Sequence, residues 1–122
     1  MVTLISVRFK SIYKIDNESD KIEFCAKGYK KIEDNKTIIY FKHEHAYKFI
    51  IDGNNLEVNV DSSVYKFDVK TKTEAIISSD GYSYKASVIT KDLIILDDVI
   101  ELTYQLDFAN FKGDYQITLE LL

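Results

Sequence analysis

The chain has 122 residues, of which 46% are hydrophobic and 30% charged, so we expect one globular domain spanning residues 1–122 and neither a disordered nor a fibrous chain. The net charge of −4 comes from acidic and basic residues that are mixed along the whole sequence, which argues against nucleic acid and membrane as partners. No apolar run is long enough to cross a bilayer, and the single Cys25 has no intramolecular disulfide partner. We therefore predict a cytoplasmic protein.

The first third of the chain alternates apolar and polar residues, which is the period of two that a half-buried strand requires. Residues 3–13 already alternate in this way and carry basic residues, so we expect a strand there rather than a secretion signal. A second strand over residues 21–29 places Cys25 on its polar face. Gly28 interrupts that strand, as a bulge or a close backbone approach requires.

The middle of the chain is divided by short polar segments that are typical of tight turns. Asp-Gly within Asp52–Asn55 is the clearest of them, because this pair suits a hairpin turn with positive φ. Between the turns lie runs rich in Tyr, Phe, Ile and Val, which favour strands. The predicted turns are residues 16–20, 33–36, 52–55, 61–63, 78–81 and 97–98.

The end of the chain is the clearest strand pair, since residues 99–108 and 115–121 alternate almost without error. No segment carries a helical period over three turns. We therefore predict an all-β fold of roughly eight to ten short antiparallel strands in meander order. Closure into a single up-and-down β-barrel is favoured over a sandwich, because long crossing loops are nearly absent.

The stretch 22–45 adds a more specific pattern: an apolar, an acidic and an aromatic residue, a glycine four positions later, then a turn and a strand with Tyr and Glu. The residues at these positions are Ile22, Glu23, Phe24, Gly28, Tyr29, Asn35, Lys36, Tyr40, Glu44 and His45. In these motifs, and in its closing hairpin, the chain resembles the YwiB-like family of uncharacterised bacterial proteins. The resemblance implies a calycin-like (lipocalin-like) barrel and no established activity. The chain departs from the family at two turns, where it has Asp61–Ser63 and Thr90–Asp92.

Motifs for catalysis and metal binding are absent from the sequence. Cys25 has no identifiable base, and no nucleophile elbow or phosphate-binding glycine loop occurs. His43 and His45 are spaced to share a strand face, but no third ligand completes a metal set. The basic and aromatic residues of 27–31 are followed at once by acidic ones, so we expect a solvated strand end there. We expect no enzyme, no cofactor and no metal site.

The tyrosines on the apolar phase of their strands are the best candidates for a site, because a buried phenol must find a hydrogen-bond partner. One explanation is a cavity with aromatic walls, and the alternative is a filled barrel whose hydroxyls reach the rim. We predict a small, partly apolar ligand in the barrel mouth, with polar contacts from Glu44 and His45. The predicted walls are Tyr47, Phe49, Tyr65, Phe67, Tyr82, Tyr84 and Tyr104.

A second hypothesis needs no cavity. The run Leu93–Leu96 is apolar on both faces and could supply an exposed surface or an edge strand. The protein would then be an interaction or structural module, in the form of a homodimer.

Overall fold

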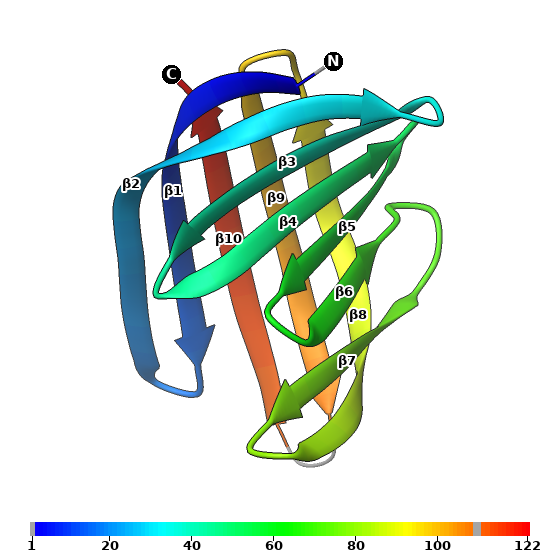
Figure 1. Ribbon diagram of the computed structural model, residues 1–122. Helices are drawn as coiled ribbons and strands as arrows, with labels where there is room; N and C mark the ends of the chain where they lie inside the picture. Colours follow the sequence, from blue (N-terminus) through cyan, green and yellow to red (C-terminus); the bar gives the residue numbers. More distant parts are fainter. Residues whose placement is uncertain (1, 109–110) are drawn as a thin grey trace.

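The computed structural model describes residues 2–108 and 111–122, which form ten antiparallel strands and no helix (Figure 1). Each strand pairs with its neighbours in sequence, and β1 pairs with β10 to close the barrel. The predicted all-β, up-and-down barrel of eight to ten strands is confirmed. The strands are β1 (Val2–Ile15), β2 (Glu18–Glu33), β3 (Lys36–His43), β4 (His45–Asp52), β5 (Asn55–Val60), β6 (Ser63–Phe67), β7 (Thr73–Ser79), β8 (Tyr82–Ile95), β9 (Val99–Phe108) and β10 (Phe111–Leu121).

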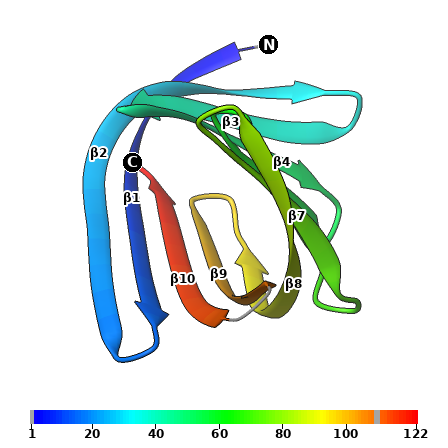
Figure 2. The same ribbon diagram turned by 90° about the horizontal axis from the view of Figure 1, so that it is seen from below.

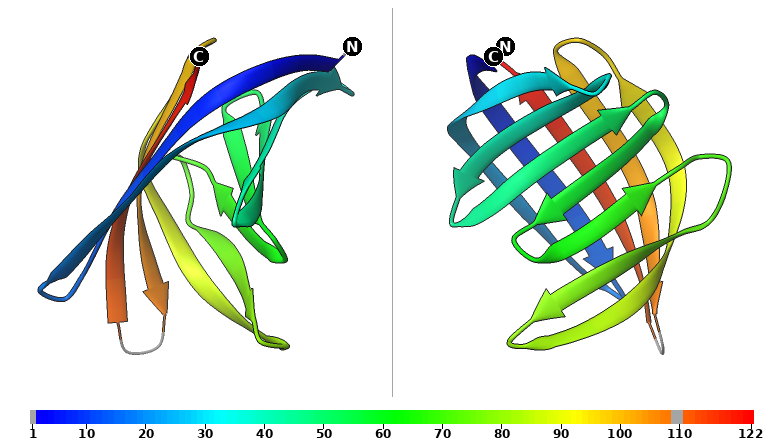
Figure 3. Two further views of the ribbon diagram at one scale, coloured as in Figure 1. Left: turned by 60° about the vertical axis from the view of Figure 1, so that its left-hand side comes forward. Right: turned by 45° about the vertical axis from the view of Figure 1, so that its right-hand side comes forward.

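The meander order places alternate turns at opposite ends of the barrel. The β1–β2, β3–β4, β5–β6 and β7–β8 turns share one end, which we call the mouth; Figure 2 looks into the ring of strands from this side. At the mouth, the β1–β2 and β7–β8 hairpins extend beyond the β3–β4 and β5–β6 turns, as both views in Figure 3 show. No helix long and apolar enough to cross a membrane occurs in the described residues.

Turn residues in the left-handed backbone region mark most strand ends. Gly53 and Gly81 have φ values of 62° and 82°, as the Asp-Gly turns predict. The β3–β4 turn was not among the predicted turns, and Glu44 makes it with a φ of 62°. His43 and His45 are therefore cross-strand partners, on the same face of the sheet but on two strands and not on one.

Gly28 is a point of close backbone approach and not a bulge. Its pairing continues without a break on both sides, to Ile5 of β1 and Phe41 of β3. A Cβ built at this position would lie 1.9 Å from the carbonyl oxygen of Tyr40. Strand β2 pairs with β3 only from Gly28 onward, so a glycine here lets β2 turn the corner of the barrel.

A bulge does occur in β8, where the register shifts between Thr90 and Asp92. Residues 93–95 continue β8 after it. Strand β8 pairs with β7 only as far as Val88, whereas residues 92–95 pair with β9. Among the described residues, this end of β8 therefore has a strand partner on one side only, as the predicted edge strand requires. Ile94 and Leu96 are 39% and 58% exposed on the outside of the barrel.

The core fills the middle of the barrel with the inward residues of every strand. Phe9, Phe41 and Phe49 pack against one another, with ring centroids 5.9 to 6.5 Å apart. Each fully buried Phe contributes about 1.5–3 kcal/mol by leaving water, so this cluster is a main source of stability. The largest fully buried side chains are Phe41, Phe49, Phe67, Ile39, Leu56, Ile100, Leu102, Leu119, Val7 and Val88.

Candidate functional site

A cavity of about 260 Å³ lies inside the barrel, between the phenylalanine core and the mouth. This volume is slightly below the range of about 300–1,000 Å³ that is usual for drug-sized ligands, so its occupant would be small. The walls come from both ends and the middle of the chain. They are formed by Phe9, Ser11, Tyr13, Ile22, Tyr47, Val58, Val60, Ser63, Tyr65, Phe67, Tyr104, Tyr115 and Ile117.

Three tyrosines form a row across adjacent strands on one wall of the cavity. Tyr13 of β1 pairs directly with Tyr115 of β10, and Tyr115 pairs with Tyr104 of β9. The rings of Tyr104 and Tyr115 stack at 5.0 Å and 9°, while those of Tyr13 and Tyr115 are 5.9 Å and 27° apart. Phe67 continues the aromatic surface, with its ring 4.7 Å from that of Tyr104. The three tyrosines therefore form a stacked row along this wall of the cavity.

Most tyrosine hydroxyls in the cavity lack a protein partner. Tyr47 and Tyr104 are only 7% and 5% exposed, yet neither hydroxyl makes a hydrogen bond among the described residues. The same holds for Tyr65 and Tyr115, whereas the Tyr13 hydroxyl donates to Asp20 Oδ2 at 3.2 Å. Among the described residues, the only fully buried side-chain polar atom without a partner is Asn59 Oδ1, so the tyrosine hydroxyls open to the cavity, where a bound molecule can reach them.

The same phenols are held in their neutral form. Burial raises the pKa of Tyr47, Tyr65 and Tyr115, and it raises the pKa of Tyr104 well above its usual value. Tyr65 and Tyr115 add to the rise in the pKa of Tyr104, because their phenolate charges would repel its own. At physiological pH each hydroxyl can donate one hydrogen bond and accept others.

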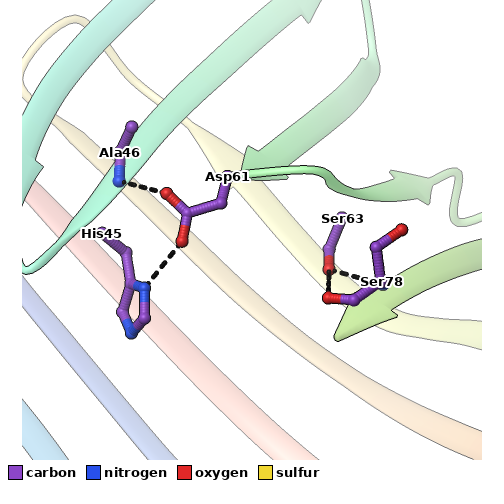
Figure 4. Close-up of polar contacts among 5 residues, drawn as sticks. All are labelled: His45, Ala46, Asp61, Ser63 and Ser78. Atoms are coloured by element: carbon purple, nitrogen blue, oxygen red, sulfur yellow. Dashed lines mark hydrogen bonds and ion pairs between the residues drawn. The ribbon is translucent and has the colours of Figure 1, made fainter. Parts of the chain in front are cut away.

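The polar contacts at the β3–β4 and β5–β6 turns hold the rim of the mouth together (Figure 4). Asp61 accepts one hydrogen bond from the Ala46 amide at 2.9 Å and contacts His45 Nδ1 at 2.7 Å. The Ala46 amide lowers the pKa of Asp61 most, and the hydrogen bond with His45 lowers it further. These groups are exposed and bond to each other, so they fix the turns rather than face the cavity.

Ser63 lines the cavity, but its hydroxyl forms hydrogen bonds with the neighbouring strand of the barrel wall. It accepts a hydrogen bond from the Ser78 amide at 3.0 Å and donates to the Ser78 carbonyl at 3.4 Å (Figure 4). Strands β6 and β7 share a short ladder of Val64 with Ile76 and Tyr65 with Ala75. The hydrogen bonds between Ser63 and Ser78 therefore add to the few contacts that join β6 and β7 near the mouth.

The structure brings together four of the nine residues proposed from the sequence: Tyr47, Tyr65, Phe67 and Tyr104. Phe49 is fully buried in the core and does not line the cavity. Tyr82 and Tyr84 lie on the projecting β7–β8 hairpin, where they are 74% and 45% exposed, and Tyr84 packs on Phe108. Glu44 and His45 are exposed in the β3–β4 turn, outside the cavity.

Two lining tyrosines were missing from the predicted set. Tyr13 continues the apolar phase of Val7 and Phe9, and Tyr115 opens the apolar phase of the last strand. The alternation that places both tyrosines on the apolar face of their strands was visible in the sequence. Tyr115 lies beside Tyr104 through the closing strand pair that the sequence predicts, whereas Tyr13 joins them only through the pairing of β1 with β10, which no local pattern reveals.

The histidines take separate structural roles. The ring of His43 stacks on Phe24 at 4.2 Å and 14°, while His45 contacts Asp61. In the described part of the chain, His, Cys, Asp and Glu side chains do not gather in groups of three or more that could hold a metal ion.

A larger hollow of about 580 Å³ lies at the opposite end, beside the β4–β5 turn and the β6–β7 loop. Most of its walls are exposed turn residues, including Gly53, Asn54 and Lys70. It has no aromatic side chain among its described lining residues, so the tyrosine cavity, with its buried aromatic walls, is the stronger candidate.

The fold matches a known structure. The YwiB protein from Bacillus subtilis superposes with a TM-score of 0.73 at 17% sequence identity, over 99% of this chain and 93% of that one. The resemblance to the YwiB-like family that the motifs indicate is thus confirmed at the level of the fold. No protein-family model matches the sequence, and the comparison with curated proteins finds no match.

Proposed function

We propose that this protein binds a small, partly apolar molecule in the tyrosine-lined cavity at the mouth of the barrel. The observation that carries the proposal is the set of buried phenols, Tyr47 and Tyr104 above all, that line a cavity and lack a protein hydrogen bond. Aromatic walls with a few convergent polar groups are the usual composition of a small-molecule site.

A binding role fits the cavity better than catalysis does. Among the described residues, its walls contain aromatic and aliphatic side chains and two serines, but no Asp, Glu, His, Cys or Lys to act as acid, base or nucleophile. Ser63 is already engaged with Ser78. We therefore propose a carrier or sensor of the ligand, with the calycin-like classification that the sequence motifs imply.

The proposed location is the cytoplasm. Cys25 is a free, exposed thiol, which suits a reducing compartment.

Isothermal titration calorimetry with 2-naphthol tests the proposal. This probe is a two-ring molecule that is smaller than the cavity. The variant Val60→Phe places a ring in the cavity wall, so we expect it to abolish saturable binding. Val64→Phe is the matched control, because Val64 belongs to the adjacent strand and lies outside the cavity lining. If the parent protein does not bind, or if Val60→Phe binds as well as Val64→Phe, the proposal fails.

The alternative is an interaction module that dimerises through the outside of β8. Its support is the exposure of Ile94 and Leu96, at 39% and 58%. Sedimentation of the parent protein beside Leu96→Lys distinguishes the two: a dimer that the lysine dissociates would favour this alternative.

A further inference from the structure

Among the described residues, the cavity walls carry no charged side chain of either sign. Two carboxylates lie at the rim: Asp20 accepts a hydrogen bond from the Tyr13 hydroxyl, and Asp61, which is paired with His45, adds to the rise that burial causes in the pKa of Tyr47. A charged ligand would leave water without gaining a counterion in the walls. That desolvation is costly for either sign, and the rim carboxylates add repulsion for an anion.

The shape of the walls selects for a flat ring. Tyr104 and Tyr115 are almost parallel, at 9°, and Tyr13 lies only 27° from Tyr115. These rings stack on one another in a row across three neighbouring strands. An aromatic ligand beside this row gains stacked or edge-to-face ring contacts beyond the area it buries.

The hydroxyls select for a polar group on that ring. Tyr104 is 5% exposed and its hydroxyl has no partner among the described residues, so a purely hydrocarbon ligand would seal it from water. Tyr65 and Tyr115 are close enough to influence the same hydroxyl. A ligand hydroxyl or amide beside Tyr104 would satisfy it.

We propose that the ligand is an uncharged, flat aromatic molecule with a hydroxyl or amide group, held against the Tyr104–Tyr115 pair with that group bonded to Tyr104. This inference rests on the proposed function and names the chemical class of the ligand.

Three probes that share one ring system and differ in charge test the inference. At neutral pH, 2-naphthol is uncharged, 2-naphthoate is an anion and 2-naphthylmethylammonium is a cation. We expect 2-naphthol to bind at least tenfold more tightly than either charged probe, because only it enters without an unpaired charge. If a charged probe binds as tightly and Val60→Phe removes its binding, the cavity is a site but the charge selection is wrong. If none of the three binds, the proposed function and this inference both fail.

The variant Tyr104→Phe tests the polar contact. Loss of one hydrogen bond should weaken 2-naphthol binding roughly three- to tenfold while the ring stack remains. Tyr40→Phe is the control, because Tyr40 stacks on Tyr29 at 5.2 Å and does not line the cavity. Equal affinities of the two variants for 2-naphthol would overturn the assignment of Tyr104.

Discussion

Gly28→Ala adds a single methyl group and is nevertheless expected to destabilise the barrel strongly. The new Cβ would lie 1.9 Å from the carbonyl oxygen of Tyr40 and 2.9 Å from Phe41 Cβ. Two of the nearest atoms are backbone, so no rotation of a side chain relieves the contact. Strands β2 and β3 must instead move apart by about 1.5 Å to reach ordinary van der Waals contact.

The size of the effect follows from what that movement disrupts. The ladder between β2 and β3 starts at Gly28 with Phe41 and Tyr29 with Tyr40, and a lost hydrogen bond costs about 0.5–1.5 kcal/mol. Displacing the fully buried Phe41 adds overpacking of about 1–3 kcal/mol. Alanine stiffens the unfolded chain and returns about 0.4–1 kcal/mol. We expect a net loss of about 2 kcal/mol, within a range of about 0.5–4 kcal/mol, in the free energy of unfolding, which is a large share of the roughly 5–15 kcal/mol of a typical domain.

Urea unfolding followed by far-ultraviolet circular dichroism measures this loss, with an unchanged m-value as the sign that only stability has changed. Gly53→Ala is the control. Gly53 has a φ of +62° but no atom within 4 Å of its added Cβ, so only the backbone penalty of about 1–2 kcal/mol applies. The reasoning is refuted if Gly28→Ala lowers the free energy of unfolding by less than about 0.5 kcal/mol, which is the low end for one hydrogen bond. It is also refuted if Gly28→Ala lowers this free energy by less than Gly53→Ala does.

Three further predictions concern the ionisable and hydroxyl groups of the mouth. Tyr104→Phe should keep the free energy of unfolding within about 0.5 kcal/mol of the parent, because no protein hydrogen bond is lost; a larger loss in urea unfolding would reveal a partner. The raised pKa of the buried tyrosines means that stability falls as pH rises above their ordinary value of 10.0, and Tyr115→Phe should make that alkaline decline shallower. The lowered pKa of Asp61 has the opposite sign: its contribution is present above its ordinary value of 3.8 and is lost as pH falls through the folded value. Asp61→Asn should therefore flatten the acid side of the stability profile, and an unchanged profile would contradict the role of Ala46 and His45.

The alternation of residues was enough to predict the barrel, because it states which face of each strand is buried. It also placed Tyr47, Tyr65 and Tyr104 on the inward phase, where the structure has them. Alternation does not state how far the barrel wall extends along the strand. Tyr82 shares an inward phase with buried Ala86, yet it lies beyond the wall, next to the β7–β8 turn, and is 74% exposed.

The remaining differences come from turn geometry and from strand pairing between the chain ends. Glu44 adopts a left-handed conformation, which is uncommon for glutamate, so the pattern gave no reason to end β3 at His43. As a result, His45 begins a new strand and bonds to Asp61. The row of Tyr13, Tyr115 and Tyr104 exists only because the last strand closes on the first.

The number of strands explains why this end of the barrel is hollow. Side chains just fill the interior of a barrel of about eight strands, and the interior widens as strands are added. With ten strands, large phenylalanines are needed to fill the middle, where Phe9, Phe41 and Phe49 meet. At the mouth, the rings of Tyr104 and Tyr115 are 5.0 Å apart, close to the spacing of roughly 4.8 Å between neighbouring strands. The two rings therefore stack as cross-strand neighbours, and the space beside this stack is the cavity that a ligand would occupy.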